Sequence, residues 1–173
     1  EALSISQRLN AFESIAMGYW GLGWLHFDRG EYAKAREFLE KMYEVYEKAG
    51  DKLDQMWVSR YLIWTYIELG ESEKAKNLID DLHTYAVEVE DKEFIAVADA
   101  LRGMLFRAQK KWEESIEHFE KSLREHEALD ARRWYIYWFA KFVLCEYARV
   151  YLERDQEGDR ERANNLLNQA LEI

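Results

Sequence analysis

Apolar residues recur along this chain with the three-to-four-residue spacing of an amphipathic helix, and two kinds of segment alternate. The first kind is rich in large apolar and aromatic residues, and the second kind is more charged. Glycine separates the two in Arg29-Gly30-Glu31 and in Leu69-Gly70-Glu71. The pattern therefore predicts four helix pairs: 11–29 with 32–48, 51–69 with 72–89, 91–110 with 112–128, and a last pair that starts at Asp130.

One short motif closes on a small residue in each predicted pair, at Ala35, Ala75, Ser115 and Ala163. The first three of these residues are forty positions apart. A constant period of this size is typical of stacked helical repeats. The last interval is eight residues longer, and we place the additional residues in Leu152 to Gly158, because residues 153–159 are polar. We therefore expect a longer first helix and a looser turn in the fourth pair.

Helix N-caps obey nearly the same period, because Asn10, Asp51, Asp91 and Asp130 each precede an apolar segment. They divide one array into repeats 10–50, 51–90, 91–129 and 130–173. Residues 1–9 then read as the end of an earlier second helix. The chain begins and stops at equivalent phases of the repeat. We therefore expect either a piece of a longer array or ends that stack on neighbouring chains.

The residues that recur with this period carry a family resemblance. The first repeat has Tyr19, Leu22, Gly23, Gly30, Tyr32, Ala35 and Leu39, and the later repeats keep part of this set. These units resemble the tetratricopeptide repeat family, in a variant with a forty-residue period. The resemblance implies an all-α, right-handed superhelical solenoid of antiparallel helix pairs. It also implies an interaction scaffold or regulatory module without catalysis of its own.

The resemblance further implies which first-helix positions line a concave groove, here called the groove positions. The candidates for binding a partner are Met17, Trp20, Trp24, Phe27, Trp57, Arg60, Trp64, Arg107 and Arg149. Tryptophan and arginine are enriched in binding hot spots. Two alternatives stay open: the tryptophans form core, and the arginines are ordinary solvated side chains instead of contacts for an acidic ligand.

The net charge of −10 argues against nucleic acid and anionic membranes as partners. Cys145 is the only cysteine, which makes a reducing, cytoplasmic setting the default, and its aromatic neighbours favour a buried thiol. The four histidines, His26, His83, His118 and His126, form no convergent ligand set, so we expect structural roles, no metal and no cofactor.

The sequence therefore predicts a module that holds a peptide or helix of a partner protein in an aromatic-lined groove. No catalytic constellation or phosphate-binding loop is visible, so we expect no enzyme. The alternative is a self-associating assembly module that stacks through uncapped terminal helices, with the protein itself as partner.

Overall fold

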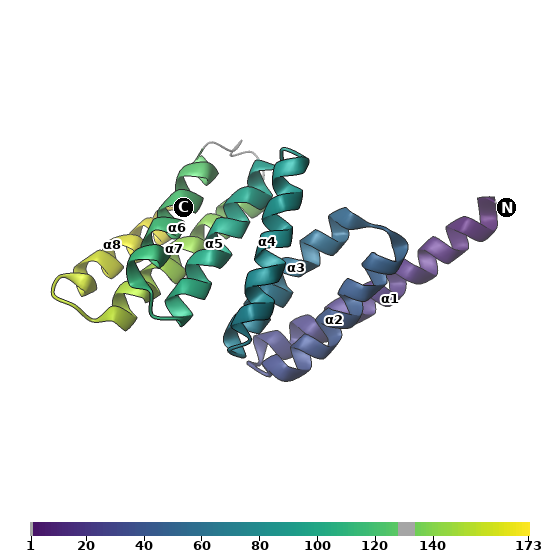
Figure 1. Cartoon of the computed structure of the whole chain (residues 1–173), viewed down its shortest axis with the longest axis horizontal. Coiled ribbons are helices and arrows are strands. Elements are labelled where there is room, and N and C mark those ends of the chain that lie inside the picture. The colour runs from purple at the N-terminus through teal and green to yellow at the C-terminus, as the bar shows by residue number, and fades with distance from the viewer. Residues whose placement is uncertain (1, 128–133) are drawn as a thin grey trace. The chain divides into compact units, whose positions relative to one another are not determined.

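A computed structural model describes residues 2–127 and 134–173, with the side chains of 12–127 and 139–173. The described chain is all helical (Figure 1). Its eight helices are α1 (Ala2–Asp28), α2 (Tyr32–Ala49), α3 (Lys52–Glu68), α4 (Ser72–Glu88), α5 (Lys92–Ala108), α6 (Trp112–Glu127), α7 (Trp134–Arg154) and α8 (Asp159–Glu172). The predicted all-α class with successive helix pairs is confirmed.

The helices end where left-handed backbone is available. Gly30 and Gly70 have φ of +70° and +73°, and Lys110 takes the same place in the third pair with φ of +58°. Gly50 and Glu90 follow the second helices in the same way, with φ of +72° and +55°. Glycine adopts this conformation without steric cost, whereas Lys110 and Glu90 adopt it at some cost. The turns therefore share the left-handed backbone conformation even where the sequence has lysine or glutamate in place of glycine.

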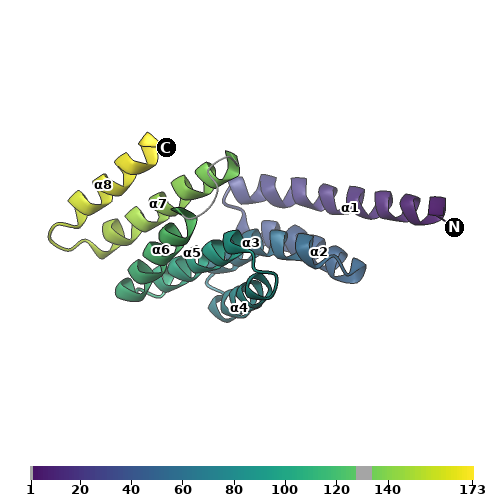
Figure 2. The same ribbon diagram turned by 90° about the horizontal axis from the view of Figure 1, so that it is seen from above.

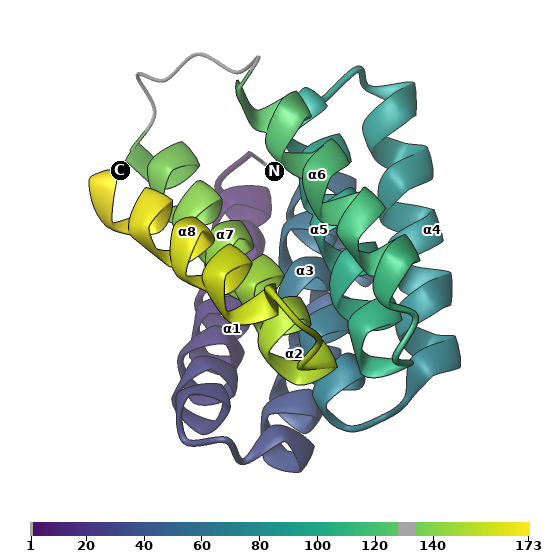
Figure 3. The ribbon, with the colours of Figure 1, turned by 90° about the vertical axis from the view of Figure 1, so that its left-hand side faces the viewer.

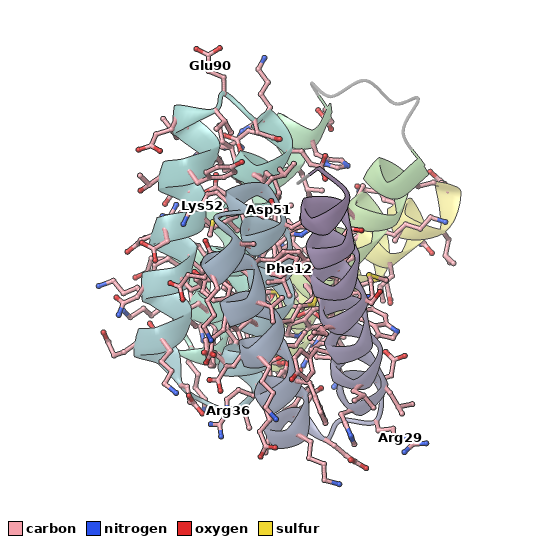
Figure 4. The ribbon with its side chains drawn as sticks, turned by 90° about the vertical axis from the view of Figure 1, so that its right-hand side faces the viewer. Phe12, Arg29, Arg36, Asp51, Lys52 and Glu90 are labelled. Carbon is pink, nitrogen blue, oxygen red and sulfur yellow. The ribbon has the colours of Figure 1, made fainter. Side chains whose placement is uncertain are left out.

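Two of the predicted N-caps are confirmed. The Asp51 carboxylate accepts a hydrogen bond from the backbone N–H of Asp54 at 3.1 Å. The Asp91 carboxylate accepts from the N–H groups of Glu93 and Phe94, at 2.9 and 3.0 Å. Figure 4 shows Asp51 and Lys52 at the start of α3. The predicted cap at Asp130 and the predicted helix end at Ala128 lie outside the described residues.

The predicted cap at Asn10 is wrong, because α1 runs without interruption from Ala2 to Asp28. Residues 1–9 are therefore not the end of a separate helix; from Ala2 on they belong to α1. No glycine or proline stands between positions 2 and 17, and a single asparagine inside a helix costs less than 1 kcal/mol. In Figure 2, α1 continues well beyond the helix that it pairs with, α2.

By compactness the chain divides into two units, unit 1 with residues 1–75 and unit 2 with residues 76–173. In unit 1, α2 packs against both α1 and α3. In unit 2, α6 packs against α5 and α7, and α7 also packs against α8 (Figure 3). The division of the chain into four repeats stays a prediction.

The small residues of the repeat motif lie where the helices cross. Ala35, Ala75, Ser115 and Ala163 are all fully buried. The Ser115 hydroxyl donates to the carbonyl oxygen of Gly103 at 2.7 Å, which satisfies it inside the core. A methyl group on Gly103 would lie 3.0 Å from the Phe119 ring, and one on Gly23 would lie 3.1 Å from Leu39. Glycine at these two positions therefore allows the close approach of paired helices.

The fourth pair has the predicted longer first helix. α7 contains 21 residues and α5 contains 17, and a loop follows α7 before α8 begins at Asp159. The Arg154 guanidinium donates two hydrogen bonds to the Asp159 carboxylate, at 2.9 and 2.7 Å. The backbone N–H of Gln156 donates to the same carboxylate at 3.0 Å. These three hydrogen bonds hold the loop between α7 and α8 in place, and the sequence pattern did not predict them.

Candidate functional site

Six aromatic residues from α1 and α3 meet in unit 1 and form what we call the aromatic cluster. Its members are Trp20, Trp24, Phe27, Trp57, Tyr61 and Trp64. Each helix contributes three rings at the spacing of four and then three residues, which places them along one helix face. Because α2 packs against both helices, it holds α1 and α3 on either side of the rings.

Ring contacts join the two helices at several levels. Trp20 lies with its ring centroid 4.9 Å from Trp57 and 4.6 Å from Tyr61, both in edge-to-face geometry. Trp24 lies 5.4 Å from Tyr61, and Phe27 lies 4.8 Å from Trp64. Edge-to-face pairs at these separations stabilise by about 0.5–1.5 kcal/mol each beyond their buried area. The cluster is therefore held in place before any partner arrives.

The side chains of the aromatic cluster differ in how much of their surface is exposed. Phe27 is buried at 9% exposure, whereas Trp57 is exposed at 36%. Trp20, Trp24, Tyr61 and Trp64 are half-buried. Met17, one turn before Trp20, is 58% exposed. Among the predicted groove positions of unit 1, Phe27 is therefore the most buried, and Met17 and Trp57 are exposed.

Polar groups accompany the rings. The Arg60 guanidinium lies over the Trp57 ring, 4.9 Å from its centroid, in a cation–π contact. The Trp64 indole N–H donates to the Glu68 carboxylate at 3.2 Å. Burial raises the pKa of the Tyr61 hydroxyl, an effect that nearby Arg60 partly opposes. Among the described residues, no hydrogen bond is formed by the indole N–H groups of Trp20, Trp24 and Trp57, which leaves three donors at the surface.

The groove positions of unit 2 have a different chemistry. Arg107 is buried, and its guanidinium donates to Glu153 at 2.5 Å and to Glu146 at 3.3 Å. Arg149 is exposed and donates to the same Glu146 at 3.0 Å. Val97 and Met104 of the same helix, α5, are buried as well. The Arg107 guanidinium is therefore already paired with carboxylates of the chain itself.

Two residues at these surfaces, Tyr61 and Glu146, were not predicted from the sequence. Tyr61 contacts Trp20, Trp24 and Trp57, and it lies at the centre of the cluster. Its position four residues after Trp57 matches the spacing of Trp20 and Trp24, so the pattern contained it. Glu146, the buried partner of Arg107, had no comparable pattern, because only the packing of α5 against α7 brings the two together.

Two of the four histidines, His26 and His118, contact aromatic and acidic side chains of the chain. His26 stacks on Phe38, with centroids 5.6 Å apart, and its Nδ1 lies 2.7 Å from the Glu31 carboxylate. His118 stacks on Phe106, and its Nδ1 lies 2.9 Å from the buried Asp99 carboxylate. Lys121 pairs with that carboxylate as well, at 2.9 Å. Although burial opposes ionisation of Asp99, these two partners lower its pKa.

The prediction of a buried thiol is wrong, because Cys145 is exposed on α7. Its neighbours Val143, Leu144, Tyr147 and Ala148 turn to the core, and position 145 falls on the opposite side of the helix. In the described part of the chain, no group of three or more potential metal ligands gathers. None of the helices described is long and apolar enough to cross a membrane.

Comparison with known families gives one match. Residues 21–49, which span the end of α1 and all of α2, match the family model of the tetratricopeptide repeat. No curated protein matches the chain. The matched segment contains Gly23, Gly30 and Ala35, three of the residues on which the resemblance rested.

Proposed function

We propose that this chain, whose helix pairs and matched segment assign it to the tetratricopeptide repeat family, binds a peptide or helix of a partner protein at the aromatic cluster of unit 1. Tetratricopeptide repeats generally mediate protein–protein interactions and are typically non-catalytic. The proposal follows that role and assigns it to Trp20, Trp24, Trp57 and Tyr61, with Met17 and Arg60 at the edge.

The single observation that carries the proposal is the half-exposed state of a cluster that is already ordered. Six rings contact one another, yet Trp57 keeps more than a third of its surface exposed. Large aromatic surfaces are costly to leave in water, and exposed apolar patches on proteins commonly mark interaction sites. A ring that is already fixed loses little conformational freedom on binding, so more of the contact energy appears as affinity.

The expected partner presents an apolar or aromatic side chain that packs on these rings. Its backbone carbonyl groups accept hydrogen bonds from the indole N–H groups at the surface, which adds orientation to the apolar contact. Arg107 does not belong to this binding surface in the proposal, because Glu146 and Glu153 pair with it. Arg149 is exposed, and as a residue of unit 2 it is also left out of the proposed surface.

Selection of peptides from a random displayed library on the immobilised protein tests the proposal. We expect recovered peptides that carry an aromatic or large apolar anchor. By calorimetry, Trp57→Ala and Trp20→Ala should weaken their binding at least about tenfold, a typical hot-spot loss. Trp112→Ala removes a half-buried tryptophan from the start of α6 and is the matched control.

Peptides that bind the Trp57→Ala and Trp20→Ala variants as tightly as the unchanged protein would contradict the proposal. A library that yields no peptide dependent on these rings would contradict it as well. The circular dichroism spectrum and the thermal midpoint of each variant separate a loss of binding from a loss of folding.

A further inference from the structure

The aromatic cluster presents hydrogen-bond donors for which the described chain supplies no acceptor. The indole N–H groups of Trp20, Trp24 and Trp57 form no hydrogen bond with any described residue. The indole nitrogens of Trp20 and Trp24 are not buried, because the buried side-chain nitrogens without a partner in the described chain belong to other residues. Trp57 is 36% exposed. These three donors are therefore open to water in the free protein, and they need acceptors when a partner covers the rings.

The cluster offers few acceptors beside these donors. An indole ring has one N–H donor and no strong acceptor. The Tyr61 hydroxyl forms no hydrogen bond with a described residue, and burial raises its pKa, so it keeps its proton and can donate. The Glu68 carboxylate already accepts from the Trp64 indole N–H at 3.2 Å. A partner that covers the cluster must therefore supply acceptors, and it gains little from donors of its own.

This balance of donors and acceptors distinguishes the regular backbones that a peptide can bring. In an α-helix the carbonyl groups already accept from N–H groups of the same helix, except in the last turn. An extended β-strand brings carbonyl groups, but it brings equally many N–H groups that need acceptors. A polyproline II segment has no internal hydrogen bonds, and each proline in it has a carbonyl group and no N–H. A proline-rich segment is therefore the regular backbone that matches a surface of donors.

The charge of Arg60 disfavours a cationic ligand. The Arg60 guanidinium lies 4.9 Å from the centroid of the Trp57 ring and 5.8 Å from that of Tyr61. Aromatic faces attract cations, and here a cation of the chain itself already lies over two of the rings. A lysine, arginine or quaternary ammonium group of a partner would meet a like charge at the same faces. The cluster therefore favours a neutral, apolar anchor, which the proline ring is.

We propose that the segment bound at the aromatic cluster is proline-rich and adopts the polyproline II conformation. Its carbonyl groups accept hydrogen bonds from Trp20, Trp24 and Trp57, and its proline rings pack on the exposed aromatic faces. The inference rests on the binding role proposed above and narrows the partner from a peptide or helix to an extended, proline-rich segment. Because such a segment is stiff before it binds and the rings are ordered by one another, little conformational entropy is lost on either side.

Two peptide libraries of equal length and diversity, selected in parallel on the immobilised protein, test the inference. One library fixes prolines three positions apart, which places them on the same edge of a polyproline II helix. The other randomises one face of an alanine-rich helical host without proline. We expect enrichment from the proline library and none above background from the helical library. In calorimetry, replacing both fixed prolines of a selected peptide with alanine should weaken binding at least about tenfold, because the peptide gains N–H groups and flexibility.

The donor role of the indole groups has a readout of its own. In nitrogen-15-labelled protein each tryptophan gives one indole N–H resonance, and single substitutions assign those of Trp20, Trp24 and Trp57. We expect the proton shifts of these resonances to move downfield when a selected proline peptide is added, while that of Trp112 on α6 stays in place. Trp57→Phe keeps an aromatic ring but removes the donor, and it should weaken peptide binding about three- to tenfold. Trp112→Phe is the matched control and should leave the affinity unchanged.

The outcomes separate this inference from the proposed function. Peptides recovered from the helical library alone, and dependent on Trp20 and Trp57, would overturn the inference and leave the proposed function standing. Peptides from neither library would overturn the inference as well, and selection from the random library then decides the proposed function separately. Selected peptides that bind through lysine or arginine, or indole resonances that do not move, would also contradict the proposed arrangement.

Discussion

The groove positions of the two units carry opposite chemistries. In unit 1 they hold aromatic rings that are ordered by one another and partly exposed, such as Trp20 and Trp57. In unit 2 they hold an arginine and its carboxylate partners, with Arg107 and Glu146 both buried. The same helical frame thus carries a partly exposed aromatic surface in one unit and buried ion pairs in the other.

The two units differ in whether the side chains at their groove positions already have partners within the chain. The buried charges of unit 2 are neutralised inside the chain, because a buried charge without a partner is costly. The rings of unit 1 need no such compensation, and they lose only part of their hydration when they pack together. Unit 1 therefore retains aromatic surface that is only partly buried.

The largest effect should come from removing the charge at the centre of the unit 2 surface. Arg107→Ala removes the buried guanidinium that pairs with Glu146 and leaves this buried carboxylate with the exposed Arg149, and we expect a loss of about 3–5 kcal/mol in the free energy of unfolding. Chemical denaturation checks this value. Arg149→Ala removes an exposed arginine that pairs with the same glutamate and should cost under about 1 kcal/mol. Equal losses from the two variants would contradict the buried role of Arg107.

A second comparison concerns the glycines at the helix crossings. A methyl group on Gly103 meets the rigid Phe119 ring at 3.0 Å, so Gly103→Ala in unit 2 should destabilise by about 1–3 kcal/mol. The equivalent Gly23→Ala in unit 1 should cost less, because the flexible Leu39 side chain can shift. Gly23→Leu should still unfold unit 1, since no large side chain fits there.

The matched control is Gly21→Ala, because no atom lies within 4 Å of a methyl group at Gly21. It should stabilise α1 by about 0.5–1 kcal/mol through helix propensity alone. Thermal and denaturant unfolding of the three alanine variants should rank them in this order. A Gly103→Ala variant as stable as Gly21→Ala would show that the crossing can relax.

A pH-dependent effect should appear in unit 2. The Arg154 guanidinium beside Asp159 lowers the pKa of that carboxyl from its ordinary 3.8 to about 2. Because the folded pKa is depressed, the stabilisation is complete above about pH 4 and is lost as the pH falls through about 2. Asp159→Asn lacks this titration. The difference in unfolding free energy between the two proteins should therefore shrink from pH 5 to pH 2, measured by denaturation at each pH.

The smallest effect concerns the turns that both units share. Lys110 has φ of +58° at the place where Gly30 and Gly70 stand. Lys110→Gly should remove this strain and stabilise α5 and α6 by about 0.5–1 kcal/mol. A thermal midpoint raised by a few degrees would support this expectation. Lys111→Gly, one residue later, lies outside the left-handed position and should give no gain.

Much of the fold was predictable because it depends on local pattern. Helical spacing, glycine stops and the caps at Asp51 and Asp91 predicted most helix bounds, and the buried small residues marked the crossings. The prediction for Asn10 failed because a cap residue does not by itself end or begin a helix. The prediction for Cys145 failed because aromatic neighbours in sequence point to other sides of the helix than the thiol does.

The candidate site was predictable only in part. The spacing of Trp20, Trp24 and Phe27 predicted an aromatic face, but it did not reveal that Tyr61 would stand at its centre. The resemblance treated Arg107 as one more groove arginine. Its pairing with Glu146 depends on the contact between α5 and α7, which are separated along the chain by a whole helix.

The sequence by itself determined the helices, their pairing and the period of the repeat, because these follow from spacing along one helix and from single residues at turns. The tertiary structure alone decided which faces stay uncovered and which charges are neutralised. Leu22 shows the reason: its helix position predicts an apolar packing face, yet it is 43% exposed, while its equivalents Leu62 and Tyr147 are buried. Burial depends on the neighbouring helix, and no local pattern records whether that neighbour is present.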